Sequence, residues 1–329
     1  MTITGLLAFG FTSCSDDDNS SGGGETPAPE ATLNIVETAQ SVDDLSILVD
    51  ALTQAELVST LQAIGNKTVL APTNEAFQNF LDQKGFASLE EVPNDVLVAI
   101  LLNHVIDGAN ISSSDLNDTG YTNTLATGAG GNSMSLFYDG TSGLVFNGIS
   151  TVTTADVETT NGIVHIVDTV IDLPTIATFA TSNPELSNLV ATMQLADSGN
   201  NPAIDFIDTV SNETAGPFTV FAPTNAAFEN LLTELGLTSL DEVGSETAND
   251  ALLVHILNEI NATSNDLADG PLTTLGGDIT VDATAFTLTD SRDRTAGIIT
   301  DLVNIQASNG IVHVIDSVLL PLAPAISTP

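Results

Sequence analysis

Residues 68–77 read TVLAPTNEAF and residues 219–228 read TVFAPTNAAF, so a ten-residue phrase returns 151 positions later with two changes. A second phrase, NGIVHIVDTV at 161–170, returns as NGIVHVIDSV at 309–318. A spacing of this size is that of a whole domain and is too long for a solenoid unit. The chain of 329 residues is therefore predicted to contain two copies of one domain.

Helices are expected early in each copy. Residues 45–61 carry apolar side chains at helical spacing, and residues 68–71 form a short β-type run that a proline ends. Thr73 is placed to cap the following helix. The buried stripe of that helix is expected to consist of Phe77, Phe80 and Leu81.

In each copy, strands are expected after one further predicted helix start. Ser88 and Ser239 are each followed three residues later by Glu, which predicts two capping boxes. Residues 125–157 and 272–305 are rich in Thr, Val, Phe and Gly, which is typical of strands and turns. Helices followed by strands around one core predict an α+β fold for each copy. The most buried strands are expected at the apolar runs 163–167 and 311–315.

Four segments follow from these patterns. Residues 1–30 read as a signal-like start and a polar Gly/Ser/Pro tether, and residues 31–174 are expected to form the first domain. Residues 175–322 are expected to form the second domain, and residues 323–329 a short tail. Because the join between the two domains is short, we expect the domains to touch.

The charge of the chain is strongly one-sided. There are 43 Asp and Glu residues against 4 Lys and Arg, which gives a formal net charge of −39. Such a chain repels phosphates, so nucleic acid is excluded as a partner. An acidic, solvated surface is the expected consequence, and calcium binding remains open although the sequence contains no EF-hand loop.

Cys14 is the only cysteine, so a disulfide within the chain is excluded. A short apolar run precedes it, and Ser-Asp-Asp-Asp follows it. This arrangement resembles a bacterial lipoprotein signal, in which the cysteine is acylated and becomes the mature N-terminus. The acidic residues resemble the tag that sends Bacteroidetes lipoproteins to the outer surface. The resemblance implies lipidation at Cys14 and a lipid-anchored position on the outer membrane, facing outward.

The four histidines occupy the same two positions in each copy, and are His104, His165, His255 and His313. Metal ligation or general-base chemistry is one interpretation. Each lies in an apolar pattern without metal-ligand spacing, which favours a buried histidine that hydrogen-bonds the backbone.

Other polar residues of the two boxes also allow two interpretations. Asp168 and Asp316 are metal-ligand candidates, but hydrogen bonds to nearby backbone are expected. Thr73, Asn74, Thr224 and Asn225 are candidates for a pocket lining, but helix capping accounts for them. No nucleophile elbow and no phosphate-binding loop occurs in the sequence, so catalytic, cofactor-binding and metal sites are all predicted to be none.

The APTN box, a histidine about 30 residues later and the NGIVH box together resemble the fasciclin (FAS1) domain, over nearly the full length of both copies. The resemblance implies a β-wedge, two small sheets folded against each other and flanked by a helical layer. It also implies an extracellular role in adhesion, without a cofactor and without catalytic residues. Asn103 and Val254 stand where the family carries the Tyr of a Tyr-His pair, which puts integrin-type recognition in doubt.

The expected function is a surface-anchored, non-catalytic adhesion or interaction protein. Its expected partners are an extracellular polysaccharide, a matrix protein or a cell-surface protein, with the membrane contacted only through the lipid anchor. Two alternatives stay open: an enzyme that acts on a carbohydrate or polymer through paired carboxylates, and a passive structural spacer. The absence of Trp and the presence of only 2 Tyr argue against a sugar-stacking active site and also weaken the case for conventional glycan binding.

Salt is predicted to stabilise the folded protein. Crowding of the uncompensated negative charge opposes folding, and screening is strong once the Debye length falls to about 3 Å near 1 M salt. We expect sodium chloride to raise the melting temperature by several degrees, measured by circular dichroism. Calcium chloride at matched ionic strength is the control, since a gain with calcium alone would indicate dedicated carboxylate sites. A flat sodium chloride series would refute the repulsion argument.

Overall fold

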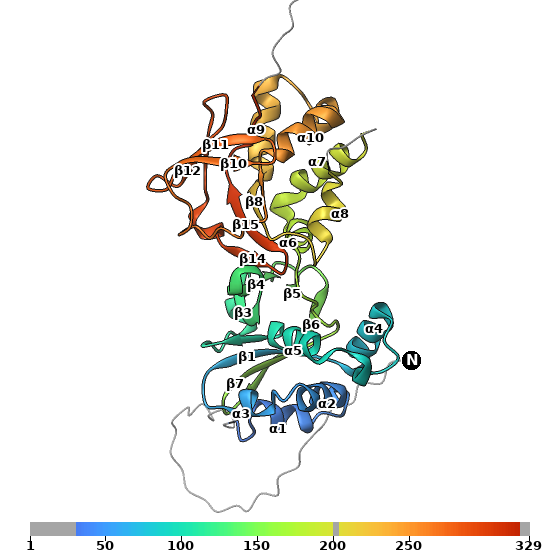
Figure 1. Cartoon of the computed structure of the whole chain (residues 1–329). Helices are drawn as coiled ribbons and strands as arrows, with labels where there is room; N and C mark the ends of the chain where they lie inside the picture. Colours follow the sequence, from blue (N-terminus) through green and yellow to red (C-terminus); the bar gives the residue numbers. More distant parts are fainter. Residues whose placement is uncertain (1–30, 200–203, 323–329) are drawn as a thin grey trace, which may run out of the picture. The chain divides into compact units, whose positions relative to one another are not determined.

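The computed structural model describes residues 31–199 and 204–322, so Cys14 and residues 323–329 lie outside the described part. In each repeat one strand lies among the helices and the other strands follow them, and the predicted α+β fold is confirmed (Figure 1). The helices of the first repeat are α1 (Ile35–Gln40), α2 (Ser46–Gln54), α3 (Val58–Gln62), α4 (Asn74–Lys84) and α5 (Asn94–Asn103), with 3-10 turns η1 (Asp43–Leu45), η2 (Leu89–Glu91), η3 (Ser113–Asp115) and η4 (Ala129–Gly131). Its strands are β1 (Lys67–Pro72), β2 (Val105–Asp107), β3 (Thr119–Thr127), β4 (Ser133–Asp139), β5 (Val145–Phe146), β6 (Ser150–Thr159) and β7 (Gly162–Val167).

The second repeat follows the same order. Its helices are α6 (Ile176–Ser182), α7 (Ser187–Asp197), α8 (Phe206–Ser211), α9 (Asn225–Leu235) and α10 (Ser245–Leu253), with 3-10 turns η5 (Pro184–Leu186), η6 (Leu240–Glu242) and η7 (Thr300–Leu302). Its strands are β8 (Phe218–Pro223), β9 (Ile256–Asn258), β10 (Gly270–Thr274), β11 (Gly277–Asp282), β12 (Thr287–Thr289), β13 (Thr295–Gly297), β14 (Ile305–Ala307) and β15 (Gly310–Ile315).

The helix after the APTN box forms as predicted. The N–H of Ala76 donates to the Thr73 hydroxyl at 3.1 Å, and Gly85 ends α4 in the left-handed conformation at φ 77°. Phe77, Phe80 and Leu81 are buried against the helical core. The equivalent helix α9 is capped in the same way by Thr224.

Two helix predictions were wrong in detail. The single helix expected over residues 45–61 is divided into α2 and α3, because Glu56 takes a positive φ of 57° at the break. The capping boxes expected at Ser88 and Ser239 are not formed, since neither serine side chain caps its turn. Instead, the carboxylate of Glu91 accepts the N–H of Ala87 at 2.8 Å.

The two predicted buried strands lie beside the APTN strands. β1 pairs in parallel with β7, and β8 pairs in parallel with β15, over six residues in each case. Side chains of β1, β8 and β15 are buried throughout, as the continuous apolar runs predicted.

The sheets of the two repeats differ in continuity. The second repeat has two separate sheets, β14-β15-β8-β9 and β10-β11-β12-β13, while the first has one sheet in the order β2-β1-β7-β6-β5-β4-β3. In the first repeat β6 is ten residues long and has irregular register around Thr154, so it pairs with both β7 and β5. In the second repeat the 3-10 turn η7 interrupts the corresponding stretch between β13 and β14.

The two repeats meet at a seam formed by β3 and β4 of the first and by α6 and β14 of the second. Phe137 of β4 is 1% exposed and belongs to the helical core of the second repeat. Tyr121 of β3 contacts Phe179 edge-on at 5.6 Å between ring centroids, and its hydroxyl accepts the Asn183 amide at 3.1 Å. The N–H of Gln306 donates to the Ser135 hydroxyl at 3.0 Å. The expected contact between the domains is therefore present.

Residues 31–174 expressed alone are predicted to unfold cooperatively, but at a lower temperature than the full chain. The fragment keeps its own two core clusters. It loses the cover over Tyr121 and Phe137, whose burial contributes on the order of 2–5 kcal/mol together. Calorimetry of the fragment and of the full chain measures the difference.

Phe137→Ser is the matched variant for this comparison. It should lower the melting temperature of the full chain by several degrees and leave that of the fragment nearly unchanged. A broad, non-cooperative melt of the fragment would contradict independent folding of the repeat.

Candidate functional site

His104 and His255 each join a helix end to the segment that leaves the repeat. The Nδ1 of His104 lies 2.8 Å from the Ile100 carbonyl, and its Nε2 accepts the N–H of Ile171 at 2.9 Å. His255 lies 2.8 Å from the Ala251 carbonyl and accepts the N–H of Leu319 at 3.0 Å. Since Nε2 accepts in both rings, Nδ1 carries the proton. Burial lowers the pKa of both residues to about 4.

His165 and His313 occupy the buried parallel strands and have the opposite tautomer. The Nε2 of His165 lies 2.9 Å from the Ile111 carbonyl, and its Nδ1 accepts the N–H of Asp156 at 3.2 Å. His313 repeats this arrangement with the Ala262 carbonyl at 2.9 Å. All four histidines thus have both ring nitrogens near backbone groups, as the apolar pattern predicted.

The asparagines of the APTN boxes do not cap the helices that follow their boxes, but each binds the first turn of an earlier helix. The carbonyl oxygen of the Asn74 side chain accepts the N–H of Ile47 at 2.9 Å, and its amide donates to the Asp43 carbonyl at 3.0 Å. Asn225 makes the same bridge to the N–H of Asn188 and to the Pro184 carbonyl. These side chains tie two helical segments together by accepting a first-turn N–H of α2 or α7, while the threonines cap the helices that follow the boxes.

The aspartates after the buried strands hold a neighbouring strand. Asp168 accepts the N–H of Thr151 at 2.8 Å, and Asp316 accepts the N–H of Gly297 at 2.7 Å. The prediction of hydrogen bonds to nearby backbone is confirmed for both. Within residues 31–199 and 204–322 no group of three or more His, Cys, Asp or Glu is arranged to hold a metal ion.

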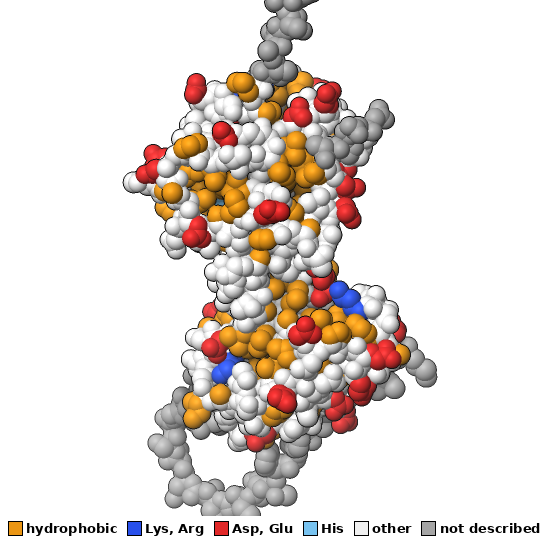
Figure 2. Space-filling view, in the orientation of Figure 1, with side chains coloured by type: hydrophobic (Ala, Val, Ile, Leu, Met, Phe, Trp, Pro, Cys, Tyr) orange, Lys and Arg blue, Asp and Glu red, His pale blue; other side chains and the backbone are white. Residues whose placement is uncertain are grey.

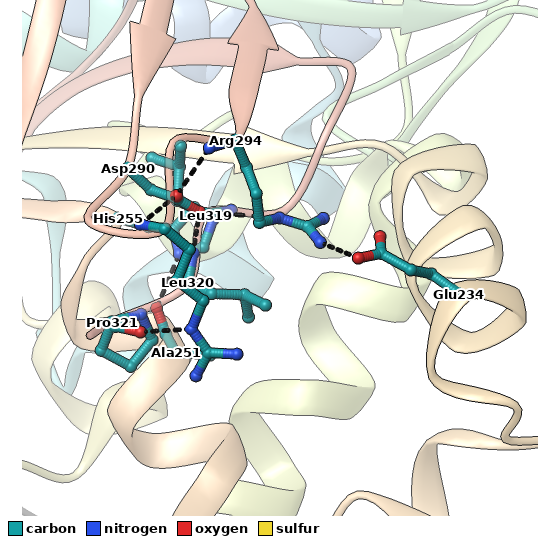
Figure 3. Close-up of polar contacts among 9 residues, drawn as sticks. Glu234, Ala251, His255, Asp290, Arg294, Leu319, Leu320 and Pro321 are labelled. Atoms are coloured by element: carbon teal, nitrogen blue, oxygen red, sulfur yellow. Dashed lines mark hydrogen bonds and ion pairs between the residues drawn. The ribbon is translucent and has the colours of Figure 1, made fainter. Parts of the chain in front are cut away.

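A buried carboxylate fixes the end of the second repeat, beside His255 (Figure 3). Asp290 is 4% exposed and accepts the N–H groups of Arg292, Arg294 and Leu320. The guanidinium of Arg294 lies between Asp290 and Glu234, and that of Arg292 donates to the Pro321 carbonyl at 2.7 Å. This cluster satisfies the backbone of the exit segment and leaves its carboxylate enclosed.

One surface pocket of the second repeat contains two carboxylates. It has a volume of about 440 Å³ and is lined by Ile260, Leu267, Asp266 and Asp269 among others. Hydrogen bonds from Thr263 lower the pKa of Asp266, whereas a general acid needs a raised one. Asp269 accepts the N–H of Ala283 at 2.7 Å. Asp266 therefore does not have the raised pKa that the acid of the paired-carboxylate alternative requires.

A second pocket lies at the seam and is called here the amide pocket. Its volume is about 320 Å³, and its lining is uncharged: Asn123, Asn132, Ser133, Thr263, Asn265, Asn304, Gln306 and Ile311. Figure 2 shows acidic side chains dispersed over the face in view.

The deeper side chains of the amide pocket are held in place by hydrogen bonds to backbone groups and to neighbouring side chains. Gln306 is 1% exposed, and its amide donates to the carbonyls of Ala307 and Gly310 at 2.9 Å. Its carbonyl oxygen accepts from Asn132 and Asn261. Asn304 accepts the N–H of Ser264 at 2.7 Å and donates to the Ser264 hydroxyl.

Sequence reasoning did not find the amide pocket, but comparison of the two copies contains a signal for it. Asn304 and its counterpart Asp156 both have positive φ, 57° and 59°, at the same turn. Asn265 likewise stands where the first copy has Ser114. A charged residue in one copy is thus an amide in the other, at the position that lines the pocket.

The four histidines should show their tautomers in solution, and His104 and His255 should also show their low pKa values. We expect His104 and His255 to stay neutral, with the proton on Nδ1, down to about pH 5, because burial lowers their pKa to about 4. Long-range ¹H–¹⁵N NMR spectra of the four side chains report both properties. His165 and His313 should show the proton on Nε2, which serves as an internal control.

The same shift predicts a pH dependence of stability. An unfolded histidine takes up a proton near pH 6.5, whereas the folded His104 and His255 do so only near pH 4. Their contribution to the free energy of unfolding is full above about pH 6.5 and declines toward pH 4. Titration of either ring near pH 6.5 in the folded protein would contradict the burial argument.

Comparisons with known proteins agree with this geometry. The chain is 28% identical to human periostin over 304 residues, which cover 88% of this chain and 32% of periostin, so it spans about a third of that relative. It is 35% identical over 144 residues to Protein sll1483 of Synechocystis, covering 44% of this chain and 76% of that protein.

Among solved structures, a FAS1 domain pair from the insect cell adhesion molecule Fasciclin I shares the fold. The TM-score is 0.50 and the identity 20%, covering 84% of this chain and 97% of that chain. The Fasciclin domain model matches residues 43–174 and 184–321, one match in each repeat. The chain therefore belongs to the fasciclin domain family, as a tandem pair of these domains.

Proposed function

We propose that this chain is a surface-anchored, non-catalytic interaction protein that binds an extracellular polysaccharide, a matrix protein or a cell-surface protein. The observation that carries the proposal is the match of a fasciclin domain to both repeats. Periostin, which matches 88% of this chain, and the insect cell adhesion molecule Fasciclin I support it.

The use of the polar residues supports an interaction role over catalysis. The histidines and the box aspartates bind backbone groups of their own repeat. A catalytic acid or base needs a polar atom that can exchange a proton with the substrate. The polar atoms of these side chains instead form hydrogen bonds within the fold. The enclosed carboxylate of Asp290 is likewise engaged by three backbone N–H groups.

A lipid anchor is the proposed route to the surface. No helix within residues 31–199 and 204–322 is long and apolar enough to cross a bilayer. Cys14 lies outside the described residues, and its place after an apolar run supports acylation. We propose that residues 15–30, which are rich in Gly, Ser and Pro, serve as a spacer between an anchored cysteine and the first repeat.

Binding to arrayed extracellular polymers tests the proposed function. Residues 31–329 would be labelled and applied to an array of glycans and matrix proteins, with and without calcium. Reproducible binding to at least one class supports an interaction role. Failure to bind any arrayed polymer and any intact cell surface would overturn it and leave the spacer alternative.

Cys14→Ala is predicted to move the protein from the membrane fraction to the soluble fraction, because the acylated thiol is the only expected membrane contact. The measurement is fractionation of cells that express the full chain, followed by immunoblotting. Ser13→Ala is the matched control and should leave the protein with the membranes. Membrane association that survives Cys14→Ala would remove the lipoprotein interpretation.

A further inference from the structure

We propose that the amide pocket at the seam of the two repeats binds a short segment of a neutral carbohydrate. The inference rests on the proposed interaction function and names the ligand class and the site. Both repeats contribute, with Asn123, Asn132 and Ser133 from the first and Thr263, Asn265, Asn304 and Gln306 from the second.

The charge of the lining selects the ligand class. None of the lining residues is charged, although the chain carries 43 acidic residues. A uronate or sulfated glycan would meet the repulsion of the surrounding acidic surface without a cation in the pocket to offset it. A basic peptide would find no carboxylate in the lining with which to pair. A neutral ligand that is rich in hydroxyl groups avoids both penalties.

The hydrogen-bonding capacity fits vicinal hydroxyl groups. An Asn side chain offers one acceptor and one donor group side by side, which matches two adjacent hydroxyls of a sugar. Asn265 is exposed, and within the described part of the chain its side chain has no hydrogen-bond partner. Asn123 is exposed and uses only its oxygen, which accepts from Ser135 at 3.4 Å.

Two side chains of the pocket are held in place before any ligand binds, which favours a binding site over a surface hollow lined by mobile side chains. Gln306 and Asn304 are locked by the contacts described above, so a ligand does not have to order them. The volume of about 320 Å³ lies at the lower end of the range for small-ligand sites, roughly 300–1,000 Å³.

The lining of the amide pocket contains no aromatic side chain, so we expect its affinity for a sugar to be low. Without stacking, a single site should bind weakly, with a dissociation constant on the order of 1 mM. Anchored copies on one surface that meet a repeating polymer raise the avidity by about 10²–10⁴. Weak single sites and repetitive ligands are therefore consistent with an adhesive role.

The test uses neutral hexasaccharides of glucan, mannan, galactan and xylan, with uronate and sulfated oligosaccharides of similar length as comparison ligands. Binding is followed by ¹H–¹⁵N spectra of the side-chain amides in the protein 31–329. We expect at least one neutral probe to shift the Asn123 and Asn265 signals, and the charged probes to leave them unchanged.

Asn265→Ala and Asn123→Ala should each weaken binding about fivefold to tenfold without a change in melting temperature, because both side chains are exposed. Ser114→Ala, at the place of Asn265 in the first repeat, is the matched control and should bind as the parent does. Binding of a glycan or a matrix protein that neither asparagine variant affects would overturn the inference while leaving the interaction function intact. Binding of charged probes only would also overturn it, and failure of every probe and every arrayed polymer would overturn both.

Discussion

The parallel pairing of the APTN strand with the NGIVH strand is the constraint on which each repeat depends. Parallel partners cannot be joined by a tight turn, and in each repeat most of the domain lies between them. The buried asparagine that begins each NGIVH box holds the helical layer to this pair: Asn161 accepts the N–H of Ile35 and donates to the carbonyls of Leu61 and Ala63. Asn309 makes the same contacts with Ile176, Val210 and Asn212. Three chain segments far apart in sequence thus meet on one amide.

The structure of the repeated boxes could be predicted because a helix cap depends on residues close in sequence and a buried strand has a continuous apolar sequence. Continuous apolar runs identify buried strands, and Thr before a helix start identifies a cap, so β1, β7 and α4 were expected from residues alone. The break between α2 and α3 could not be predicted, because it depends on a positive φ at Glu56 that no residue type there demands. The capping boxes failed for a related reason. The Ser-x-x-Glu spacing is right, but the turns end after three residues, and Glu91 bonds outside them.

The amide pocket lay beyond sequence reasoning because its residues become neighbours only when the two repeats meet. Asn123 and Asn265 are distant in sequence and belong to different domains. What the sequence does contain is a difference between the copies. Where the first repeat has Asp156 bonded to Ser113, the second has Asn304 bonded to Ser264, with the same backbone conformation. A shared fold therefore keeps the geometry, while the change of one carboxylate to an amide removes charge from the side that faces the seam.

Of the four cations, Lys84 lies where the two repeats meet, and the other three lie within a single repeat. Lys67 is 5% exposed and donates to the Ala63 carbonyl, and Arg292 and Arg294 hold the exit segment of the second repeat. Lys84 lies at the junction of the repeats, 2.5 Å from Asp172 and 3.5 Å from Glu213, and these carboxylates favour its charged form. Its ammonium is partly exposed, so the ion pairs themselves contribute little. Asp172 and Glu213 would repel each other across the junction, but both contact the ammonium of Lys84. The other seam contacts described above are aromatic or uncharged polar. A seam built in this way can form despite the net charge of the chain, because its one close group of charges contains a cation that both carboxylates contact.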